Sequence, residues 1–567
     1  MRRAVQTSLL CFVCLGAFAV PASAAPSIES ASFSLSSKQA GAHADLTVSV
    51  ALKEAGDPET AKTLRLGLPP GHFLYPDTGP GCSSAAFGAG TCPIGSQVGI
   101  VELAGDHEGD PDHEFAPAPL YLLTPADGEM ARLGFVIPAV GVPVVAPVTV
   151  RGTDQGLDLE FGSFPQTVPL TGIAVSLWGV PAAAIHDELR GGPSNVPETP
   201  LLRNPTSCGA LGSLGVTAES WEKPGESATL ATATPAIGGC EKLAFHPALS
   251  AELGSAETSA PTGLELGFTL PADLTPQGLS GSDAETVDFT LPPELGLDEG
   301  ILAGLPTCSV AQAHLEGGPN ECPSGSALGA VQGSVAGVDA PLAGSVYFGG
   351  AEPSGAYRLF LVAAGGGVGL RRQATVAYAE ADEAWVIDLP NLPQLPIDSL
   401  ELEVAVAGGP FVTPPECGSF DLVGDFAPWS DGPGVRALRG LKTETGPGGG
   451  PCPGPTEEVP GSAPPTQTAP APPPIPAANP LPPAVKLRGR PAKETLDRTP
   501  TFRFVSTVPG SSFRCKLDKR PLRSCRSPLT LSQLAFGRHS FKVRAIAPSG
   551  LASAFVSYGF VVRRPGS

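Results

Sequence analysis

An all-β fold is predicted for this chain of 567 residues by three features of its sequence. Apolar and polar residues alternate in many short runs, such as Leu46–Leu52 and Leu64–Leu68, and this is the period of a half-buried strand. Glycine (70 residues) and proline (65 residues) separate these runs, as turns separate short strands. Segments with helical period are scarce. The length indicates several domains rather than one hydrophobic core.

The strands belong to a pattern that occurs twice along the chain. Leu-Pro-Pro is found at 68–70 and again at 291–293, and it ends a strand because proline lacks the amide donor of a central strand. A cysteine follows each copy, at Cys82 and at Cys308. The sequence then reads Cys-Pro-x-Gly-Ser-x-(Val/Leu)-Gly in both copies, at residues 92–99 and 322–329.

Further paired landmarks extend this likeness over both copies in the same order. They include Ala118-Pro119-Leu120 with Ala340-Pro341-Leu342, Phe164-Pro165-Gln166 with Leu392-Pro393-Gln394, and Cys208-Gly209 with Cys417-Gly418. Chance does not produce so many matches in one order. We therefore predict two homologous β-sandwich modules, residues 25–240 and residues 241–452, derived from a tandem duplication.

The first 24 residues are expected to be a signal peptide. Met1-Arg2-Arg3 gives a basic start, Leu9–Val20 is an apolar run of suitable length, and Ala22-Ser23-Ala24 supplies a cleavage site. No later run reaches the 18 or so apolar residues of a membrane helix, so no transmembrane segment is expected after cleavage. The expected location is secreted or associated with the cell surface.

Ten cysteines remain after cleavage, an even number that indicates a disulfide framework in an exported chain. Zinc ligation is the alternative, but the mature chain contains no Cys-x-x-Cys. Sequence order and the symmetry of the repeat suggest the connectivity without fixing it. The suggested pairs are Cys82–Cys92, Cys308–Cys322, Cys208–Cys240, Cys417–Cys452 and Cys515–Cys525.

Two further segments follow the duplicated body. Residues 453–483 are rich in proline and alanine and are predicted to form a disordered, semi-rigid linker. Residues 484–567 contain short alternating strands, such as 501–504, 512–517 and 539–545, separated by glycine and proline turns. Seven or so strands in a domain of this length indicate an immunoglobulin-like or fibronectin-III-like sandwich.

Four segments of this last domain carry a resemblance to a known family: Phe513-x-Cys515-x-Leu517-Asp518, Cys525-x-Ser527-Pro528, Leu534-x-x-Gly537-x-His539-x-Phe541-x-Val543, and Phe560-x-Val562. On these residues it resembles the bacterial Ig-like domains of secreted proteins from high-GC Gram-positive (actinobacterial) bacteria. The duplicated body, with its Leu-Pro-Pro and Cys…Cys-Pro modules, resembles large exported multidomain proteins of the same bacteria. The resemblance implies an exported location and this architecture, and it carries over no catalytic residue.

Charge separates the last domain from the rest of the chain. Residues 486–567 contain 17 Lys and Arg against 3 acidic residues, a net of +14; the whole chain carries −20, so residues 1–485 carry −34. Capture of an anionic polymer, such as a wall phosphate polymer or extracellular DNA, is the functional hypothesis. The alternative is a soluble basic domain, or one balanced by the acidic body. The candidate binding residues are Arg514, Lys516, Lys519, Arg520, Arg523, Arg526, Lys542 and Arg544.

One predicted loop contains residue types that can ligate metal ions. Residues 106–114 read Asp-His-Glu-Gly-Asp-Pro-Asp-His-Glu, and oxygen and imidazole ligands could gather there. Pro111 interrupts the spacing of a calcium loop, and module 2 has no equivalent cluster, so a solvated turn is the favoured interpretation. The weak candidate ligands are Asp106, His107, Asp110, Asp112 and His113.

The sequence contains no Gly-x-Ser-x-Gly, no His-Glu-x-x-His and no catalytic-cysteine context. We therefore expect no enzyme, no catalytic residue, no metal and no cofactor. The leading hypothesis is an exported structural or adhesive surface protein. Its basic Ig-like domain would hold anionic envelope polymers or other surface proteins, with no specific nucleic acid. The alternatives are a glycan- or ligand-binding module that uses loops of the duplicated sandwiches, and a secreted hydrolase.

Overall fold

The computed structural model places the chain in two compact units, residues 1–458 and residues 459–567. The expected signal peptide (1–24) and proline-rich linker (453–483) lie outside the described residues. Within the described part of the chain, no helix is long and apolar enough to cross a membrane. The structure describes residues 27–452, except 54–59, 108–109, 139 and 168, and residues 485–564, except 507–511, 519, 521–522, 547–552 and 554.

The first unit contains both predicted modules, called modules 1 and 2 below. Module 1 is built from strands β1 (Ser27–Leu35), β2 (Leu46–Lys53), β3 (Ala61–Gly67), β4 (Phe73–Leu74), β5 (Gln97–His107), β6 (Asp110–Glu114), β7 (Ala118–Leu123), β8 (Ala131–Ile137), β9 (Val142–Val150), β10 (Leu157–Gly162), β11 (Leu170–Leu177), β12 (Leu202–Arg203), β13 (Ser213–Ser220) and β14 (Ser227–Ala233). Its helical turns are η1 (Pro76–Thr78), α1 (Ser84–Gly88), η2 (Ile94–Ser96), η3 (Ala184–His186), α2 (Asp187–Arg190) and η4 (Cys240–Lys242).

Module 2 repeats this plan. Its strands are β15 (Ala248–Leu253), β16 (Pro261–Thr262), β17 (Leu264–Thr269), β18 (Ala284–Thr290), β19 (Gly296–Leu297), β20 (Ala327–Val335), β21 (Val338–Ala351), β22 (Tyr357–Gly365), β23 (Val368–Ala379), β24 (Ala384–Leu389), β25 (Ile397–Val404), β26 (Phe411–Val412), β27 (Gly418–Pro428) and β28 (Val435–Thr443). Its helical turns are α3 (Glu299–Ala303), α4 (Val310–Ala313), η5 (Ser324–Ser326), η6 (Val406–Gly408) and η7 (Pro447–Gly449).

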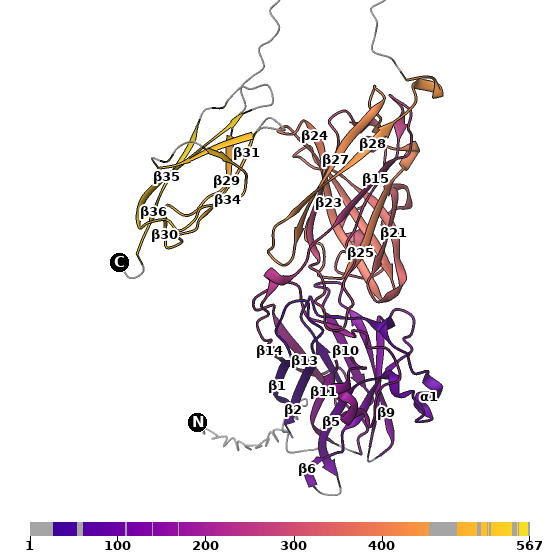
Figure 1. The fold of residues 1–567 in the computed structure, drawn as a ribbon. Coiled ribbons are helices and arrows are strands. Elements are labelled where there is room, and N and C mark those ends of the chain that lie inside the picture. Colours follow the sequence, from indigo (N-terminus) through magenta and orange to yellow (C-terminus); the bar gives the residue numbers. More distant parts are fainter. Residues whose placement is uncertain are drawn as a thin grey trace, which may run out of the picture. The chain divides into compact units, whose positions relative to one another are not determined.

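The main sheets of the two modules have equivalent strand orders. The order is β1-β2-β11-β5-β7-β8-β9-β10-β3-β13-β14 in module 1, with β6 added to β5, and β15-β17-β25-β20-β21-β22-β23-β24-β18-β27-β28 in module 2. Each sheet rolls up so that its first and last strands approach each other, β1 beside β14 and β15 beside β28 (Figure 1). The all-β fold is therefore confirmed, and the two layers of each sandwich are the two halves of one rolled sheet.

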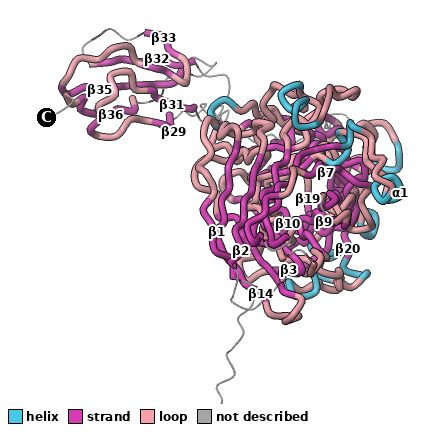
Figure 2. The backbone as a smooth tube through the Cα atoms, turned by 90° about the horizontal axis from the view of Figure 1, so that it is seen from below, coloured by secondary structure: helices cyan, strands magenta, loops and turns pink. Residues whose placement is uncertain are grey.

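Alternation along the strands gives each rolled sheet its core. On β2, Val48 and Val50 point inward and are 2% and 3% exposed, whereas the intervening Ser49 points outward. Helices contribute little, and Figure 2 shows them as short turns at the periphery of the strands. The buried residues of the two modules form one continuous cluster. The modules thus share a hydrophobic core.

Five disulfides join the pairs that sequence order and symmetry suggest. Cys82–Cys92 and Cys308–Cys322 each close a short loop over a small apolar cluster of its own. Cys208–Cys240 and Cys417–Cys452 lie near one end of the contact between first and last strands. There the chain segments just past those strands form isolated parallel bridges, Gln39 with Gly238 and Glu257 with Thr445.

A buried ion pair connects module 1 to module 2. Arg203 donates from both terminal nitrogens to the two carboxylate oxygens of Asp283, each at 2.8 Å, and their side chains are 0% and 5% exposed. Thr206 also donates to Asp283, and Gln394 hydrogen-bonds Ser207 across the same interface. These contacts lie away from water and pair the buried charge of Arg203 with that of Asp283, although Arg203 Nε has no hydrogen-bond partner among the described residues. They hold the two modules in one defined arrangement.

A glycine turn completes this interface. The glycine-rich run Gly365–Gly369 is interpreted from the sequence as a hairpin turn, and the structure confirms a turn between β22 and β23, where Gly365 pairs with Val368. Gly367 has a φ of +74°, and a Cβ atom there would lie 2.3 Å from the backbone nitrogen of Met130 in module 1. Only glycine allows both this backbone conformation and this close approach.

The second unit is a sandwich of two small sheets with its own core. Its sheets have the orders β29-β31-β34 and β30-β36-β35-β32-β33. Phe502, Phe504, Phe541 and Phe560 fill the space between them, and Cys515 bonds to Cys525 at one edge. The strands are β29 (Val485–Gly489), β30 (Glu494–Thr495), β31 (Thr501–Ser506), β32 (Ser512–Leu517), β33 (Arg523–Cys525), β34 (Leu529–Thr530), β35 (Gly537–Ile546) and β36 (Val556–Val562).

Candidate anion-binding site

Four of the predicted basic residues come together on the outer face of the second unit. Strand β32 pairs with β35 in a register that sets Arg514 opposite Arg544 and Lys516 opposite Lys542. Residues opposite each other share a face of the sheet, with side chains about 5 Å apart at Cβ. The intervening residues, among them Phe541 and Val543, face the core. We call this two-by-two array of cations the four-cation face.

The four-cation face carries like charges in direct opposition, an arrangement that destabilises a sheet. Within the described residues, none of its four side chains forms an ion pair. Arg514 and Lys542 are exposed, and Lys516 and Arg544 are half-buried. The face therefore concentrates positive charge without a compensating carboxylate, which is the electrostatic signature of a site for an anion.

An aromatic ring borders the four-cation face at one end. The Arg544 guanidinium lies over the ring of Phe555, 5.0 Å from its centroid, and Phe555 is 44% exposed. Stacking fixes the plane of the guanidinium, and its Nε atom has no hydrogen-bond partner among the described residues. Phe555 was not a sequence candidate, because only the tertiary structure brings it to Arg544.

Asp518, the acidic residue that follows β32, interacts with residues outside the four-cation face. Asp518 accepts hydrogen bonds from the Ser540 backbone N–H and contacts His539 Nδ1, each at 2.8 Å. Burial opposes the charged form of His539, but the hydrogen bonds to the Ala535 carbonyl and to Asp518 outweigh it and raise its pKa. Asp518 thus completes a local network at the end of β32 and does not neutralise the cations.

The other predicted basic residues are not part of this array. Arg523 lies opposite Cys515 in the register of β32 and β33, so it belongs to the opposite face of the sheet from Arg514. Arg520 and Arg526 are exposed beyond the ends of these strands. Lys519 lies outside the described residues. The structure therefore places four of the eight candidate residues together on one face of the sheet.

The predicted metal loop is only partly described. Its backbone forms the ends of β5 and β6, with His107 opposite Asp110. The side chains of Asp106, His107, Asp110 and Asp112 lie outside the described residues, and the ring of His113 packs edge-on against Phe115. Among the described residues, no group of three or more His, Cys, Asp or Glu side chains could hold a metal ion.

The tryptophans of the duplicated body bear on the glycan-binding alternative. Trp178 is buried and Trp385 is half-buried against the core. Trp221 and Trp429 occupy equivalent positions, and each indole Nε1 donates to a backbone carbonyl, at 2.8 Å and 2.9 Å. These two rings therefore have a shared structural role. Trp221 is also 36% exposed, and Lys62 Nζ lies 5.2 Å from its ring centroid, so of the two rings it is the one open to solvent.

No family model and no curated protein matches this chain. Among solved structures, the "Putative membrane anchored protein" of Corynebacterium diphtheriae has 9% identity and a TM-score of 0.15, over 74% of this chain and 94% of that one. Escherichia coli α-2-macroglobulin has 10% identity and a TM-score of 0.13, over 95% of this chain and 44% of that one. The E. coli adhesin FdeC has 12% identity and a TM-score of 0.11, over 74% of this chain and 99% of that one. At such TM-scores none of these likenesses supports an argument.

Proposed function

We propose that this chain is an exported, non-catalytic surface protein whose Ig-like unit holds an anionic polymer of the cell envelope. The four-cation face is the observation that carries the proposal. The N-terminal sequence pattern and five disulfides support an oxidising, extracellular compartment. The resemblance seen in the sequence favours an actinobacterial envelope.

A phosphate-bearing polymer suits this face for a physical reason. Cations recur about 5 Å apart across the strands and about 7 Å apart along them. Neighbouring charges of a flexible polyanion can therefore bind to several of these cations at the same time. Each phosphate that is neutralised releases condensed counterions, which makes such binding strong at low salt and weak at high salt. The duplicated modules are then the part displayed by the anchored protein.

Sedimentation with purified actinobacterial cell walls tests this proposal on the full chain. We expect the protein to pellet with the walls at low salt and to be released at about 0.5 M salt, where the screening length falls to about 4 Å. Added long-chain polyphosphate should compete with the walls. A wall-bound fraction that does not respond to salt would contradict an electrostatic anchor.

Two variants with the same loss of charge distinguish a site from a general attraction. In the site variant, Arg514, Lys516, Lys542 and Arg544 are all replaced by Gln. In the control variant, Arg503, Arg520, Arg523 and Arg526 are all replaced by Gln. We expect the site variant to lose affinity by about a hundredfold or more and the control by less than about tenfold, since each lost contact weakens binding separately. Equal losses would show that net charge, and not the four-cation face, attracts the polymer.

A further inference from the structure

An aromatic cluster lies at one end of the rolled sheet of module 2, where a turn at residues 380–383 joins β23 to β24. The ring centroid of Trp385 is 5.4 Å from that of Tyr378 and 6.1 Å from that of Tyr357. Tyr378 is 51% exposed, Trp385 is half-buried and Tyr357 is buried. We call these three rings and the turn the aromatic end.

Module 1 has no aromatic side chain at the same positions. The strand registers align Tyr357, Tyr378 and Trp385 with Ala131, Val150 and Leu157. Ala131 and Leu157 are buried in the core of module 1, so small and aliphatic side chains are enough to close this end of the fold. The shared architecture therefore does not explain the rings of module 2.

The equivalent end of module 1 is an interface that contains its own cation. Its turn includes Gly152, where a Cβ atom would lie 2.2 Å from the backbone oxygen of Glu316 in module 2. In the same turn, Arg151 donates to Asp154 at 2.9 Å and to Asp158 at 2.8 Å. Module 1 thus has a guanidinium paired with carboxylates at the end that contacts module 2.

The aromatic end of module 2 has carboxylates and no cation in its turn. The turn carries Glu380, Asp382 and Glu383, and all three are exposed. Glu299 accepts a hydrogen bond from the Tyr357 hydroxyl at 2.9 Å, which places a fourth carboxylate beside the rings. Negative charge therefore gathers at this end.

One arginine lies close enough to the turn to respond to its charge. The hydrogen bond to Asp425, and to a smaller degree the charge of Asp382, raises the pKa of Arg436. Asp425 binds Arg436 through both carboxylate oxygens, at 2.8 Å and 2.7 Å. This guanidinium is therefore already paired outside the aromatic end.

Exposed aromatic rings elsewhere in the protein have a cation beside them. Among the described residues, four aromatic side chains are at least 36% exposed, and Tyr378 is one of them. The other three pair with a cation 5.2, 4.9 and 5.0 Å from the ring centroid: Trp221 with Lys62, Phe536 with Arg498, and Phe555 with Arg544. No described cation lies over the ring of Tyr378, so its exposed face is open to a cation from outside the chain.

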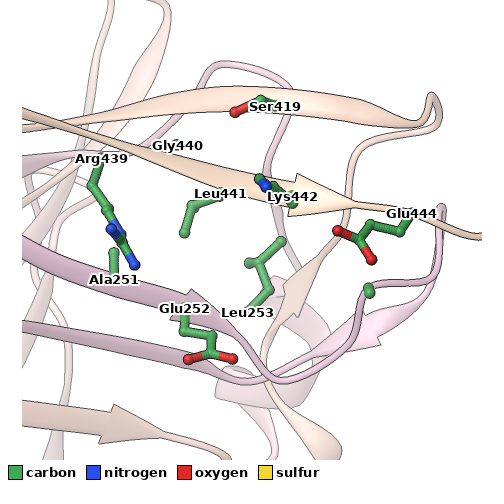
Figure 3. A pocket seen from close by; sticks show the side chains of 10 residues that line it. Ala251, Glu252, Leu253, Ser419, Arg439, Gly440, Leu441, Lys442 and Glu444 are labelled. Atoms are coloured by element: carbon green, nitrogen blue, oxygen red, sulfur yellow. The ribbon is translucent and has the colours of Figure 1, made fainter.

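A hollow elsewhere in module 2 gives a useful contrast. It has a volume of about 550 Å³ and lies beside β15 and β28. Figure 3 shows that Glu252 and Glu444 line it together with Arg439 and Lys442. Because both signs of charge are present, charge does not select an occupant for this hollow, whereas at the aromatic end it favours a cation.

We propose that the aromatic end of module 2 binds an arginine side chain in a basic segment of a partner protein. The guanidinium stacks on the exposed ring of Tyr378 and donates to carboxylates of the turn, as Arg151 donates to those of its own turn in module 1. Arginine suits this site better than lysine, because its planar group both stacks on a ring and binds carboxylates with two donors. The equivalent end of module 1 is already a protein interface, which favours a protein as the occupant.

Fluorescence anisotropy with a defined peptide tests the proposal on the full chain. The probe is Gly-Ser-Arg-Gly-Ser-Arg-Gly-Ser with rhodamine at its N-terminus and an amide at its C-terminus. We expect saturable binding with a Kd below about 1 mM, and at least about tenfold weaker binding when both Arg are replaced by citrulline, their uncharged isostere. Absence of binding at about 1 mM, or equal binding of the two peptides, would overturn the proposal.

Substitutions of Tyr378 separate this site from the general attraction of an acidic protein for a basic peptide. Tyr378→Val introduces the residue of module 1 without changing the charge, and we expect the arginine peptide to bind about threefold or more weakly. Tyr378→Phe keeps the ring and should keep the affinity. An affinity that is the same in Tyr378→Val as in the unaltered protein would overturn the proposal.

The carboxylates of the turn are tested against a control with the same loss of charge. Glu380→Gln combined with Glu383→Gln should weaken binding of the arginine peptide by about fivefold or more. Glu29→Gln combined with Glu102→Gln removes two exposed charges from strands of module 1 and should weaken it by less than about twofold. Equal losses would show that net charge attracts the peptide and would overturn the site.

Two other occupants can be recognised with the same protein. Displacement of the arginine peptide by chitohexaose, a neutral glycan, would identify an aromatic sugar platform and overturn the proposal. Self-association of the full chain in sedimentation velocity, if Tyr378→Val abolishes it, would assign the aromatic end to a second copy of this chain and would also overturn it.

Discussion

Asp288, on the outer face of module 2, lies between two other carboxylates. It is opposite Asp388 on β24 and opposite Asp425 on β27, and Asp425 is bound by Arg436. Burial, followed by the hydrogen bond with Asp388 and repulsion from both neighbours, raises the pKa of Asp288 to about 6. Arg65 is the equivalent residue of module 1, where it pairs with Asp158.

The raised pKa makes the stability of module 2 fall as the pH rises. Well below pH 3.8 Asp288 is protonated in both the folded and unfolded states, and above pH 6 its charge is disfavoured only in the folded state. We expect Asp288→Asn to stabilise the protein by about 1 kcal/mol at pH 7.5, after allowance for solvent screening, and to have little effect at pH 4. Urea unfolding at both pH values measures this. Asp421, which is exposed and lies opposite Gly440, is the control, and Asp421→Asn should change the free energy of unfolding by less than about 0.5 kcal/mol.

Arg203 presents the opposite situation, a buried charge that depends on its partner. Arg203→Met leaves the Asp283 carboxylate buried without compensation, and we expect a loss of about 3–5 kcal/mol in the free energy of unfolding. The double variant Arg203→Met with Asp283→Leu should recover most of that loss. The pair of Arg132 and Glu129, whose side chains are 29% and 12% exposed, is the control, and Arg132→Met should cost less than about 1 kcal/mol. A double variant as unstable as the single one would argue that packing, and not charge, limits this interface.

At the scale of strands, the pairing of β32 with β35 favours anion binding at the cost of stability, because it sets like charges opposite each other. Lys516→Glu places an acid opposite Lys542 and replaces a repulsive pair with an attractive one. We expect the Ig-like unit to gain about 0.5 kcal/mol, a rise of a few degrees in its melting temperature, while polymer binding weakens. Differential scanning calorimetry and wall sedimentation measure the two effects. A lower melting temperature with unchanged binding would contradict the assignment of the four-cation face.

At the scale of the whole molecule, the arrangement of hydrophobic cores predicts the number of unfolding transitions. Modules 1 and 2 share one continuous core and a buried ion pair, whereas the second unit has a separate core. Calorimetry of the full chain should therefore show two transitions, with modules 1 and 2 melting together as the larger one. We expect Arg203→Met to lower the larger transition only. Three transitions in the unaltered protein would mean that the modules unfold independently.

Local patterns were enough to predict much of this architecture. Alternation at residues such as Val48 and Val50 predicts strands because a pleated strand buries every second side chain. The repeated Leu-Pro-Pro and Cys-Pro landmarks predict two modules with the same strand order. These features are properties of neighbouring residues, and the sequence displays them directly.

Strand register and close contacts between side chains cannot be predicted from local patterns in this way, because they join residues far apart in the chain. Nothing in the sequence sets Arg514 opposite Arg544, brings Phe555 beneath it, or separates Arg523 onto the other face. The Arg203–Asp283 pair likewise depends on how two modules dock. Sequence determined which strands form and that they repeat; tertiary structure decided which side chains meet, because strand pairing and packing are decided across the whole chain.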